Sequence, residues 1–223
     1  MKNSKLLFTI TVLFVACCFM ATGSWAARKV DISRGNSQGF IGQMNQGADL
    51  GSALDLSAED GFQLIHQRTD LNGVTHYRYQ QTFKGIPVWG MQTVVSKGSD
   101  NRVLRMTGNV VRDSRGDVGN IPGSLNPGAE LRNQQKLHRD KDSGAVWSFK
   151  NEKAETVVYF HKKSKKARLA YVVSFFADTE AGNPSRPLFF IDAKNGKVID
   201  SFDALTHADG VGPGGNLKIG QYY

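Results

Sequence analysis

Five histidines are the residues of this chain best suited to bind a metal ion or to transfer a proton. A zinc-peptidase helix needs two histidines four residues apart with a glutamate directly after the first, so that both imidazoles reach the metal and the carboxylate acts on its water. The histidines are His66, His76, His138, His161 and His207, and none of them begins such a pattern. His66 and His76 fall on neighbouring expected strands, where bonding to backbone or water is the more common role than a shared metal. The histidines therefore predict no metal centre here.

Other catalytic patterns are equally hard to find in the sequence. Residues 35–39 read Gly-x-Ser-x-Gly, but they lie in a stretch rich in Gly, Ser, Gln and Asn and not at the strand-to-helix turn that a nucleophile elbow requires; the only cysteines are Cys17 and Cys18. The pair Gly214-Gly215 lacks the strand and helix that a phosphate-binding loop requires. Asp192 and Asp200 flank an expected hairpin, where aspartates commonly stabilise turns. We therefore expect a chain that performs no catalysis itself.

The N-terminus has the pattern of an export signal. Lys2 and Lys5 precede an almost wholly apolar run over residues 6–20, and Ser24 and Ala26 are small residues at the positions that a signal peptidase recognises. The pattern predicts a signal peptide over residues 1–26, cut between Ala26 and Ala27. The protein would then be secreted, to the periplasm or outside the cell.

Two alternatives for this N-terminal segment are weaker. The apolar run is short for a membrane span and has no charged flank on its far side, so we expect no stable membrane anchor after the signal is removed. Cys17-Cys18 could suggest a lipoprotein, but the residues before Cys17 match such a site poorly. Beyond the signal the chain has no cysteine, so no disulfide framework is expected.

The formal net charge is +8, from 28 basic and 20 acidic residues, and the densest basic cluster covers residues 161–168. Such a cluster could bind a polyanion and would then cause salt-sensitive retention on heparin. Strand-like segments flank it on both sides, however, and it brings neither the aromatics nor the helix typical of nucleic-acid binders. A solvated hairpin tip is the preferred interpretation, and no nucleic-acid partner is expected.

The elements that would position any functional residue are mainly β-strands. Residues 27–59 are rich in Gly, Ser, Gln and Asn and predict a loosely ordered lead-in. Asn72-Gly73 and the turn over residues 84–87 connect strands that form an antiparallel meander. Its expected strands cover residues 62–69, 74–83, 88–96 and 103–111.

A Gly- and Pro-rich stretch over residues 116–128 predicts a boundary near residue 120. Asn126 as the cap and Pro127 at the first helical position predict a helix over residues 129–138, with Leu131 and Leu137 toward the core. The fold class is therefore α+β, with two successive antiparallel β-sheet units and few helices. The strands expected in the second unit cover residues 156–160, 169–176, 188–192 and 198–202.

Beyond His207 a Gly-rich stretch cannot form a regular element, and residues 217–223 then begin to alternate like a strand. A domain rarely ends on an unpaired strand. We therefore expect further sequence downstream, with the chain as a fragment or a natural truncation.

Three segments resemble one protein family. Residues 76–90 (HYRYQQTFKGIPVWG) are similar to the fungalysin/thermolysin propeptide signature, an Arg-Tyr-x-Gln strand that leads into Gly-x-Pro-Val-x-Gly. Residues 186–199 (RPLFFIDAKNGKVI) resemble the closing hairpin of a PepSY domain. Residues 205–220 are similar to the junction between pro-region and mature enzyme in the pseudolysin–vibriolysin branch of the thermolysin family of zinc metalloproteases.

The resemblance implies a domain order for the chain. The signal would be followed by the lead-in over residues 27–59, a fungalysin/thermolysin propeptide-like domain over 60–120, a PepSY-like domain over 121–207, and the start of the mature metalloprotease over 208–223. The family's zinc ligands would lie beyond Tyr223. Zinc and calcium would thus belong to the missing catalytic domain, with no cofactor in this chain.

The resemblance also implies a partner, the cognate metalloprotease catalytic domain, and three roles. The pro-region would assist the folding of that domain, block its cleft, and be removed by cleavage between His207 and Ala208. Aromatic residues on the expected strands could supply contact area for the first role, although most of them are expected to fill the protein's own core; they are Trp89, Tyr171, Phe175, Phe176, Phe189 and Phe190. The inhibitory tail would comprise Asp203, Ala204, Leu205, Thr206 and His207. Two alternatives stay open: a free-standing secreted PepSY-type inhibitor or binding module, and an uncut linker at residues 207–208.

Overall fold

A computed structural model describes residues 26–33, 37–180, 182 and 184–205 of the chain. The strands are β1 (Arg28–Asp31), β2 (Asp60–Thr69), β3 (Thr75–Phe83), β4 (Ile86–Lys97), β5 (Val103–Arg112), β6 (Trp147–His161), β7 (Lys166–Thr179), β8 (Pro187–Asp192) and β9 (Val198–Asp203). The helices are α1 (Ser37–Asn45), α2 (Leu50–Ala53), α3 (Arg115–Val118) and α4 (Pro127–Arg139).

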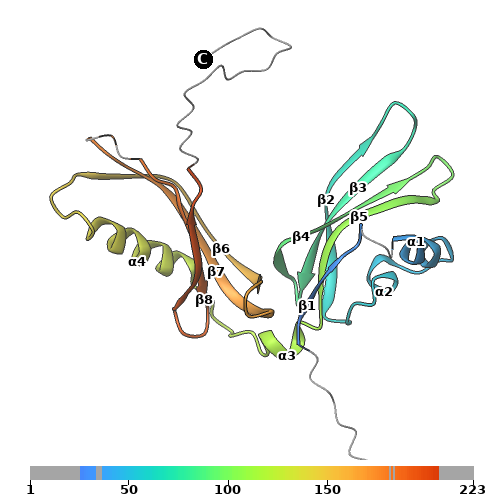
Figure 1. Cartoon of the computed structure of the whole chain (residues 1–223), viewed down its shortest axis with the longest axis horizontal. Coiled ribbons are helices and arrows are strands. Elements are labelled where there is room, and N and C mark those ends of the chain that lie inside the picture. Colours follow the sequence, from blue (N-terminus) through green and yellow to red (C-terminus); the bar gives the residue numbers. More distant parts are fainter. Residues whose placement is uncertain (1–25, 34–36, 181, 183, 206–223) are drawn as a thin grey trace, which may run out of the picture.

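The strands form two lobes that spread apart from a common joint (Figure 1). The first lobe comprises β1–β5 with α1 and α2, and its neighbouring strands are all antiparallel. The second lobe comprises β6–β9, also antiparallel, with α4 packed on its outer face. The prediction of an α+β fold with two successive antiparallel units and few helices is confirmed.

The turns that the sequence predicts connect the strands as expected. Lys84 and Gly85 have positive φ angles of 49° and 79°, which is the type I′ geometry that suits a two-residue hairpin. Gly73 and Gly196, each after an asparagine, also have positive φ, at 76° and 69°, and lie in the loops after β2 and β8. Local turn chemistry thus fixes the strand order within each lobe.

The expectation of a loosely ordered lead-in over residues 27–59 is wrong, because β1, α1 and α2 lie there. β1 pairs with β5, and α1 and α2 pack their sparse apolar residues against the first lobe. Ile32 and Leu54 are fully buried in that cluster. Elements this short are not stable alone, so packing on β5 and β2 rather than local propensity forms them.

Helix α4 begins as predicted, but its buried face differs in part. The Asn126 side chain accepts a hydrogen bond from the amide of Ala129 at 3.0 Å, with Pro127 in the first turn. Leu131 packs toward the core, whereas Leu137 is 51% exposed and that part of the prediction is wrong. Gln134 and His138 occupy the buried face instead, following the helical spacing from Leu131.

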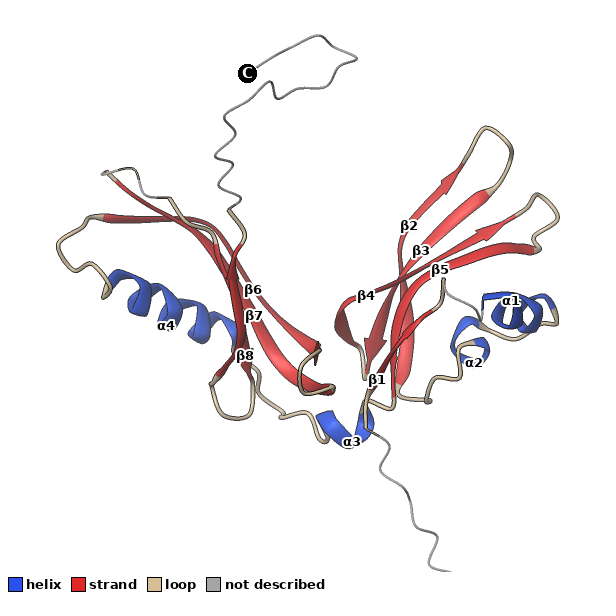
Figure 2. Ribbon diagram, viewed as in Figure 1, coloured by secondary structure: helices blue, strands red, loops and turns tan. Residues whose placement is uncertain are grey.

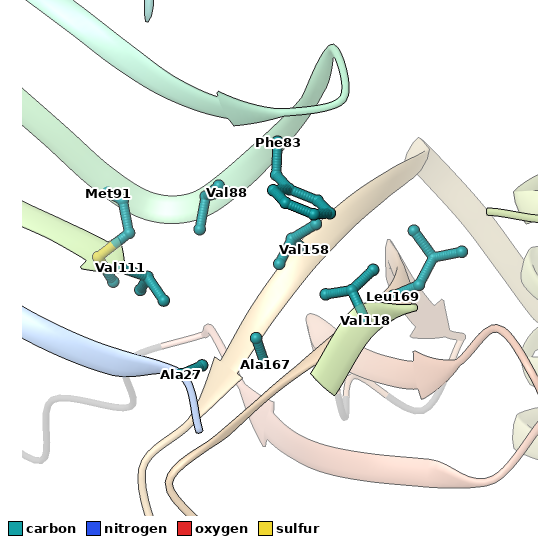
Figure 3. Close-up of a cluster of buried hydrophobic side chains, with 9 residues drawn as sticks. All are labelled: Ala27, Phe83, Val88, Met91, Val111, Val118, Val158, Ala167 and Leu169. Carbon is teal, nitrogen blue, oxygen red and sulfur yellow. The ribbon is translucent and has the colours of Figure 1, made fainter. Parts of the chain in front are cut away.

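The two lobes join through one long strand and a shared apolar cluster. Val88 in the first half of β4 pairs in parallel with Val158 of β6, whereas residues 93–97 in its second half pair with β5. Gly90, with a φ of 69°, lies between these halves. The joint cluster brings buried residues of both lobes together (Figure 3). Its members are Ala27, Phe83, Val88, Met91, Val111, Val118, Val158, Ala167 and Leu169.

Beside this joint, the side chain of Gln81 makes hydrogen bonds to β5 that a neighbouring strand would otherwise make. The register between β3 and β4 shifts between Gln80 and Thr82, which turns the fully buried Gln81 side chain toward β5. There its Nε2 donates to the Val111 carbonyl at 2.7 Å, and its Oε1 accepts from the Val111 amide at 2.8 Å. Nε2 also donates to Asp60 Oδ1 at 3.0 Å. Gln81 is the glutamine of the Arg-Tyr-x-Gln pattern, so the motif has a structural explanation.

We predict that Gln81→Leu lowers the free energy of unfolding by about 2–4 kcal/mol, because it leaves both backbone groups of Val111 buried without partners. The measurement is urea unfolding of the chain from Ala27. Gln63→Leu, at an exposed position on β2, is the matched control and should change stability by less than about 0.5 kcal/mol. Equal losses in the two variants would contradict the bridging role of Gln81.

Candidate functional site

The histidines and aspartates singled out from the sequence take part in structural contacts. His76 lies between Ser96, with Nδ1 2.9 Å from Oγ, and Asp70, with Nε2 3.2 Å from Oδ2. His66 pairs with Arg78 across the sheet, so it does not lie opposite His76. His161 Nδ1 is 2.8 Å from Ser164 Oγ at a hairpin tip. The structure thus does not bring these histidines together.

Asp192 and Asp200 also serve separate structural roles. Asp192 forms an ion pair with Arg168 at 2.9 Å and accepts a hydrogen bond from the Lys194 amide in the turn after β8. Asp200 accepts a hydrogen bond from the Tyr159 hydroxyl at 2.8 Å. Burial, followed by this bond and the negative charge of Asp200, raises the pKa of Tyr159 to about 12. Within the described residues no cluster of three or more His, Cys, Asp or Glu side chains could bind a metal ion.

The basic cluster lies where the hairpin-tip interpretation expects it. Residues 162–165 form the turn between β6 and β7, and all four are exposed. Lys165 has a positive φ of 51°, as a tight turn requires. The interpretation of this basic cluster as the solvated tip of a hairpin is therefore confirmed.

The strongest candidate for a binding surface is the inner face, where the two sheets face each other across the opening between the lobes. Helices α1 and α2 cover the outer side of the first sheet and α4 covers that of the second, whereas none of the described helices covers the inner side (Figure 2). Near the joint this face has a hollow of about 320 Å³. It is lined by Gln80, Pro87, Trp89, Gly90, Gln92, Glu155 and Val157.

Aromatic side chains line the inner face of the second lobe. The ring of Tyr159 stacks on Phe190 with centroids 4.0 Å apart, and Trp89 from β4 meets the same ring edge-on at 5.4 Å. Phe202 of β9 lies 6.3 Å from Phe190 and is 52% exposed. An exposed aromatic beside partly buried ones is typical of protein–protein contact surfaces. The inner face is therefore the surface with the strongest features of a protein-binding site in the described part of the chain.

Sequence reasoning found part of this aromatic set. Of the six candidates that it named, Tyr171, Phe175 and Phe190 are buried, and Trp89, Phe176 and Phe189 are half-buried, so most of their area fills the protein's own core. It missed Tyr159 and Phe202. These two residues lie on the same side of the sheet because of how their strands pair. Alternation of apolar residues within one strand does not predict that pairing.

The predicted inhibitory tail begins at a defined point on the sheet. Asp203 ends β9, and its Oδ1 accepts hydrogen bonds from the amides of Arg186 and Leu205, both at 2.8 Å. The amide of Ala204 donates to the Arg186 carbonyl at 2.8 Å. Thr206, His207 and Ala208 lie outside the described residues. The sheet thus fixes the root of the tail next to the half-exposed Phe202.

Comparison with known proteins identifies one part of the chain directly. Residues 60–110 match the Fungalysin/Thermolysin Propeptide Motif. The chain carries a thermolysin-type propeptide motif. This match covers β2, β3, β4 and most of β5, including Gln81 and the turn at Lys84-Gly85. The resemblance drawn from residues 76–90 is thereby confirmed, while that of residues 186–199 to PepSY stays a prediction.

Relatives over most of the chain are bacterial proteases. The neutral protease of Vibrio proteolyticus is 34% identical, and the match covers 80% of this chain and 30% of that protein. For the hemagglutinin/proteinase of Vibrio cholerae the identity is 30%, with 75% and 27% covered. For the virulence metalloprotease of Vibrio anguillarum it is 31%, with 81% and 31% covered. The chain thus spans less than a third of the length of these relatives, consistent with their propeptide region.

The C-terminal domain of YpeB from Bacillus megaterium aligns with 65% of this chain and 57% of its own at 13% identity, with a TM-score of 0.28, too low to support a statement about fold. Within the described residues no helix is both long and apolar enough to cross a membrane.

His138 is a buried histidine of the second lobe whose pKa depends on folding. It is buried between α4 and the sheet, where its ring meets Trp147 and Phe175 edge-on at 4.7 and 5.6 Å. Burial lowers the pKa of His138 and the charge of Lys141 lowers it further, whereas Asp203 acts in the opposite direction. The folded state therefore favours the neutral ring.

We predict that this histidine destabilises the fold in acid. Folding lowers the pKa of His138, so as the pH falls the unfolded chain takes up the proton first. The free energy of unfolding is therefore at its full value above the unfolded pKa of about 6.5 and decreases as the pH falls below it. Urea unfolding of the wild type and of His138→Phe, from about pH 7.5 to about pH 5, measures the difference. His138→Phe should lose less stability than the wild type, whereas His66→Phe, at an exposed strand position, should follow the wild type. Parallel curves for all three would contradict the prediction.

Proposed function

We propose that this chain is the pro-region of a secreted thermolysin-like zinc metalloendopeptidase, and that it acts as an intramolecular chaperone and as a cleft-blocking inhibitor. The observation that carries this proposal is the propeptide motif over residues 60–110, within a chain that matches less than a third of each protease relative. The catalytic domain would supply the zinc, with calcium, and the chemistry. This chain would bind and orient that domain.

The inner face supports the chaperone role. A folding assistant must present preformed structure to a partner whose own folding barrier is high. The joint cluster holds the sheets of both lobes together. The aromatics Trp89, Tyr159 and Phe202 surround Phe190, on the side of the sheet opposite to the one that Leu131 of α4 contacts. This surface would bind the folding catalytic domain.

The tail supports the inhibitor role. Asp203 fixes the point where the chain leaves the sheet, so residues after it would extend from a rigid base into the substrate cleft. Cleavage between His207 and Ala208 would then leave a terminal carboxylate near the zinc, as in a bound product. Ala208, a small apolar residue after the cut bond, suits a thermolysin-like pocket.

The inhibitory role is tested with residues 27–207, titrated into the mature neutral protease of Vibrio proteolyticus while peptide hydrolysis is followed. We expect saturable inhibition. We further predict that Phe202→Ala weakens it by about tenfold or more, because an exposed aromatic in a contact surface commonly contributes this much. Leu137→Ala is the matched control, since Leu137 is equally exposed but lies on the outer helix α4. Equal inhibition by the two variants, both shown to be folded, would contradict binding through the inner face.

The root of the tail gives a second prediction. Asp203→Ala removes the acceptor of two backbone amides and should weaken inhibition by about tenfold, because the tail then loses its fixed exit from β9. Asp203→Asn keeps an oxygen in the same place and should retain most of the inhibition. Inhibition curves of the two variants, measured with the same enzyme, provide the comparison. If Asp203→Asn were as weak as Asp203→Ala, charge rather than tail geometry would be the cause.

Processing is tested in a precursor that joins this chain to a catalytic domain. N-terminal sequencing of the released enzyme should begin at Ala208 or a close neighbour. A start far from Ala208 would refute the assignment of the junction.

A further inference from the structure

Asp117 is the residue at which three separate segments of the chain meet. It belongs to α3, which connects the two lobes. Its Oδ2 accepts a hydrogen bond from the amide nitrogen of Ala27, at the start of the first lobe, at 3.2 Å. The same oxygen accepts a second bond from the amide of Ala167, on β7 of the second lobe, at 3.0 Å. One carboxylate therefore joins both lobes and their linker.

The surroundings of this contact are closely packed. Ala27 is 3% exposed and Ala167 is 1% exposed, and both belong to the joint cluster. Val118, next to Asp117, is fully buried in the same cluster and fixes α3 in place (Figure 3). The nitrogen of Ala27 is thus held in a defined position, and Ala26, directly before it, is exposed.

Ala27 is also the residue that the export signal predicts as the first of the secreted chain. Hydrolysis of the Ala26–Ala27 bond by a signal peptidase consumes one water. Its oxygen goes to the carbonyl of Ala26, which leaves as a carboxylate, and the nitrogen of Ala27 becomes an α-ammonium group. A neutral amide beside Asp117 thereby becomes a cation.

We propose that removal of the signal peptide creates an ion pair between the new α-ammonium of Ala27 and the carboxylate of Asp117, and that this pair locks the joint between the two lobes. The inference rests on the proposed function, because it needs the chain to be exported and cut before Ala27. Before cleavage only the acceptor of this hydrogen bond is charged, whereas after cleavage the donor is charged as well, which adds a direct attraction between opposite charges at a packed site. The secreted chain would therefore have a tighter joint than its precursor, and its inner face would be more rigid after export than before.

The other charged side chains around Ala27 are mostly cations, so a new positive charge there depends on Asp117 for its stabilisation. A hollow of about 370 Å³ beside it is lined by Ala27, Arg28, Lys29, Phe160, Lys162 and Lys165, a set with four cations and no carboxylate. Arg28 is engaged by Asp113 at 3.2 Å. A new positive charge at Ala27 would be unfavourable in this setting without a carboxylate in contact. Asp117 is the carboxylate that the structure places there.

The experiment compares two forms of the chain, one beginning at Ala27 and one beginning at Ala26, each with Asp117 or with Asp117→Asn. The extra Ala26 keeps an amide at Ala27 and moves the ammonium away, as in the uncut precursor. With Asp117 present, we expect the added residue to lower the melting temperature by about 3 °C or more, the effect of about a tenfold change in the folding equilibrium for a chain of this size.

In the Asp117→Asn background the same extension should change the melting temperature by less than about 1 °C. Asp113→Asn is the matched control, because Asp113 pairs with the Arg28 side chain instead of the Ala27 nitrogen, and here the full effect of the extension should remain. An extension effect that is equal with Asp117 and with Asp117→Asn would overturn the inference. So would a secreted chain that begins elsewhere than Ala27.

These outcomes are separate from those that test the proposed function. Loss of the ion pair changes the stability of the pro-region, whereas the proposed function fails if the chain neither inhibits a thermolysin-like enzyme nor helps it refold. Inhibition without coupling between Ala27 and Asp117 would refute only this inference. Coupling in a chain that neither inhibits the enzyme nor helps it refold would refute only the proposed function.

Discussion

The parallel contact between β4 and β6 is the constraint on which the arrangement of this protein depends. Each lobe has its own antiparallel hydrogen bonds, whereas in the part of the chain that the structure describes the two sheets pair at one position, Val88 with Val158. Parallel strands cannot be joined by a tight hairpin, so the chain must return over a long connection. Here that connection includes α3 and α4, and α3 contributes Val118 to the joint cluster.

This constraint explains why the conspicuous propeptide residues lie where they do. Gly90 allows β4 to change partner, the turn at Lys84-Gly85 brings Phe83 and Val88 to the joint, and Gln81 completes hydrogen bonding where β3 leaves its regular register. Each of them is required for the fold of the joint, whether or not it contacts an enzyme. Their effect is to fix the angle at which the inner aromatics are presented, and a rigid surface loses less entropy when it binds.

The sequence predicts those features of the structure that depend on adjacent residues better than those that depend on distant ones. Turns at Asn72-Gly73 and Lys84-Gly85, and the cap at Asn126, depend on a few adjacent residues and were predictable. The lead-in helices and the burial of His138 in place of Leu137 depend on partners far along the chain, so local composition was misleading. For the candidate site, the motif pointed to the family, and aromatic content pointed to Trp89 and Phe190. The pairing that places Phe202 beside Phe190 required the fold.

The central claim is that the open inner face binds the catalytic domain, and cysteine labelling tests it most directly. The chain has no cysteine after Cys18, so in a protein that begins at Ala27 Phe202→Cys and Leu137→Cys each introduce a single thiol, on the inner face and on the outer helix. Labelling by a maleimide reagent is followed with and without a mature thermolysin-like enzyme inactivated by an active-site inhibitor that leaves the cleft accessible. The account predicts that the enzyme slows labelling at the inner position and leaves the outer position unchanged. Equal labelling at the inner position in both conditions, while the enzyme is shown to be bound, would contradict it.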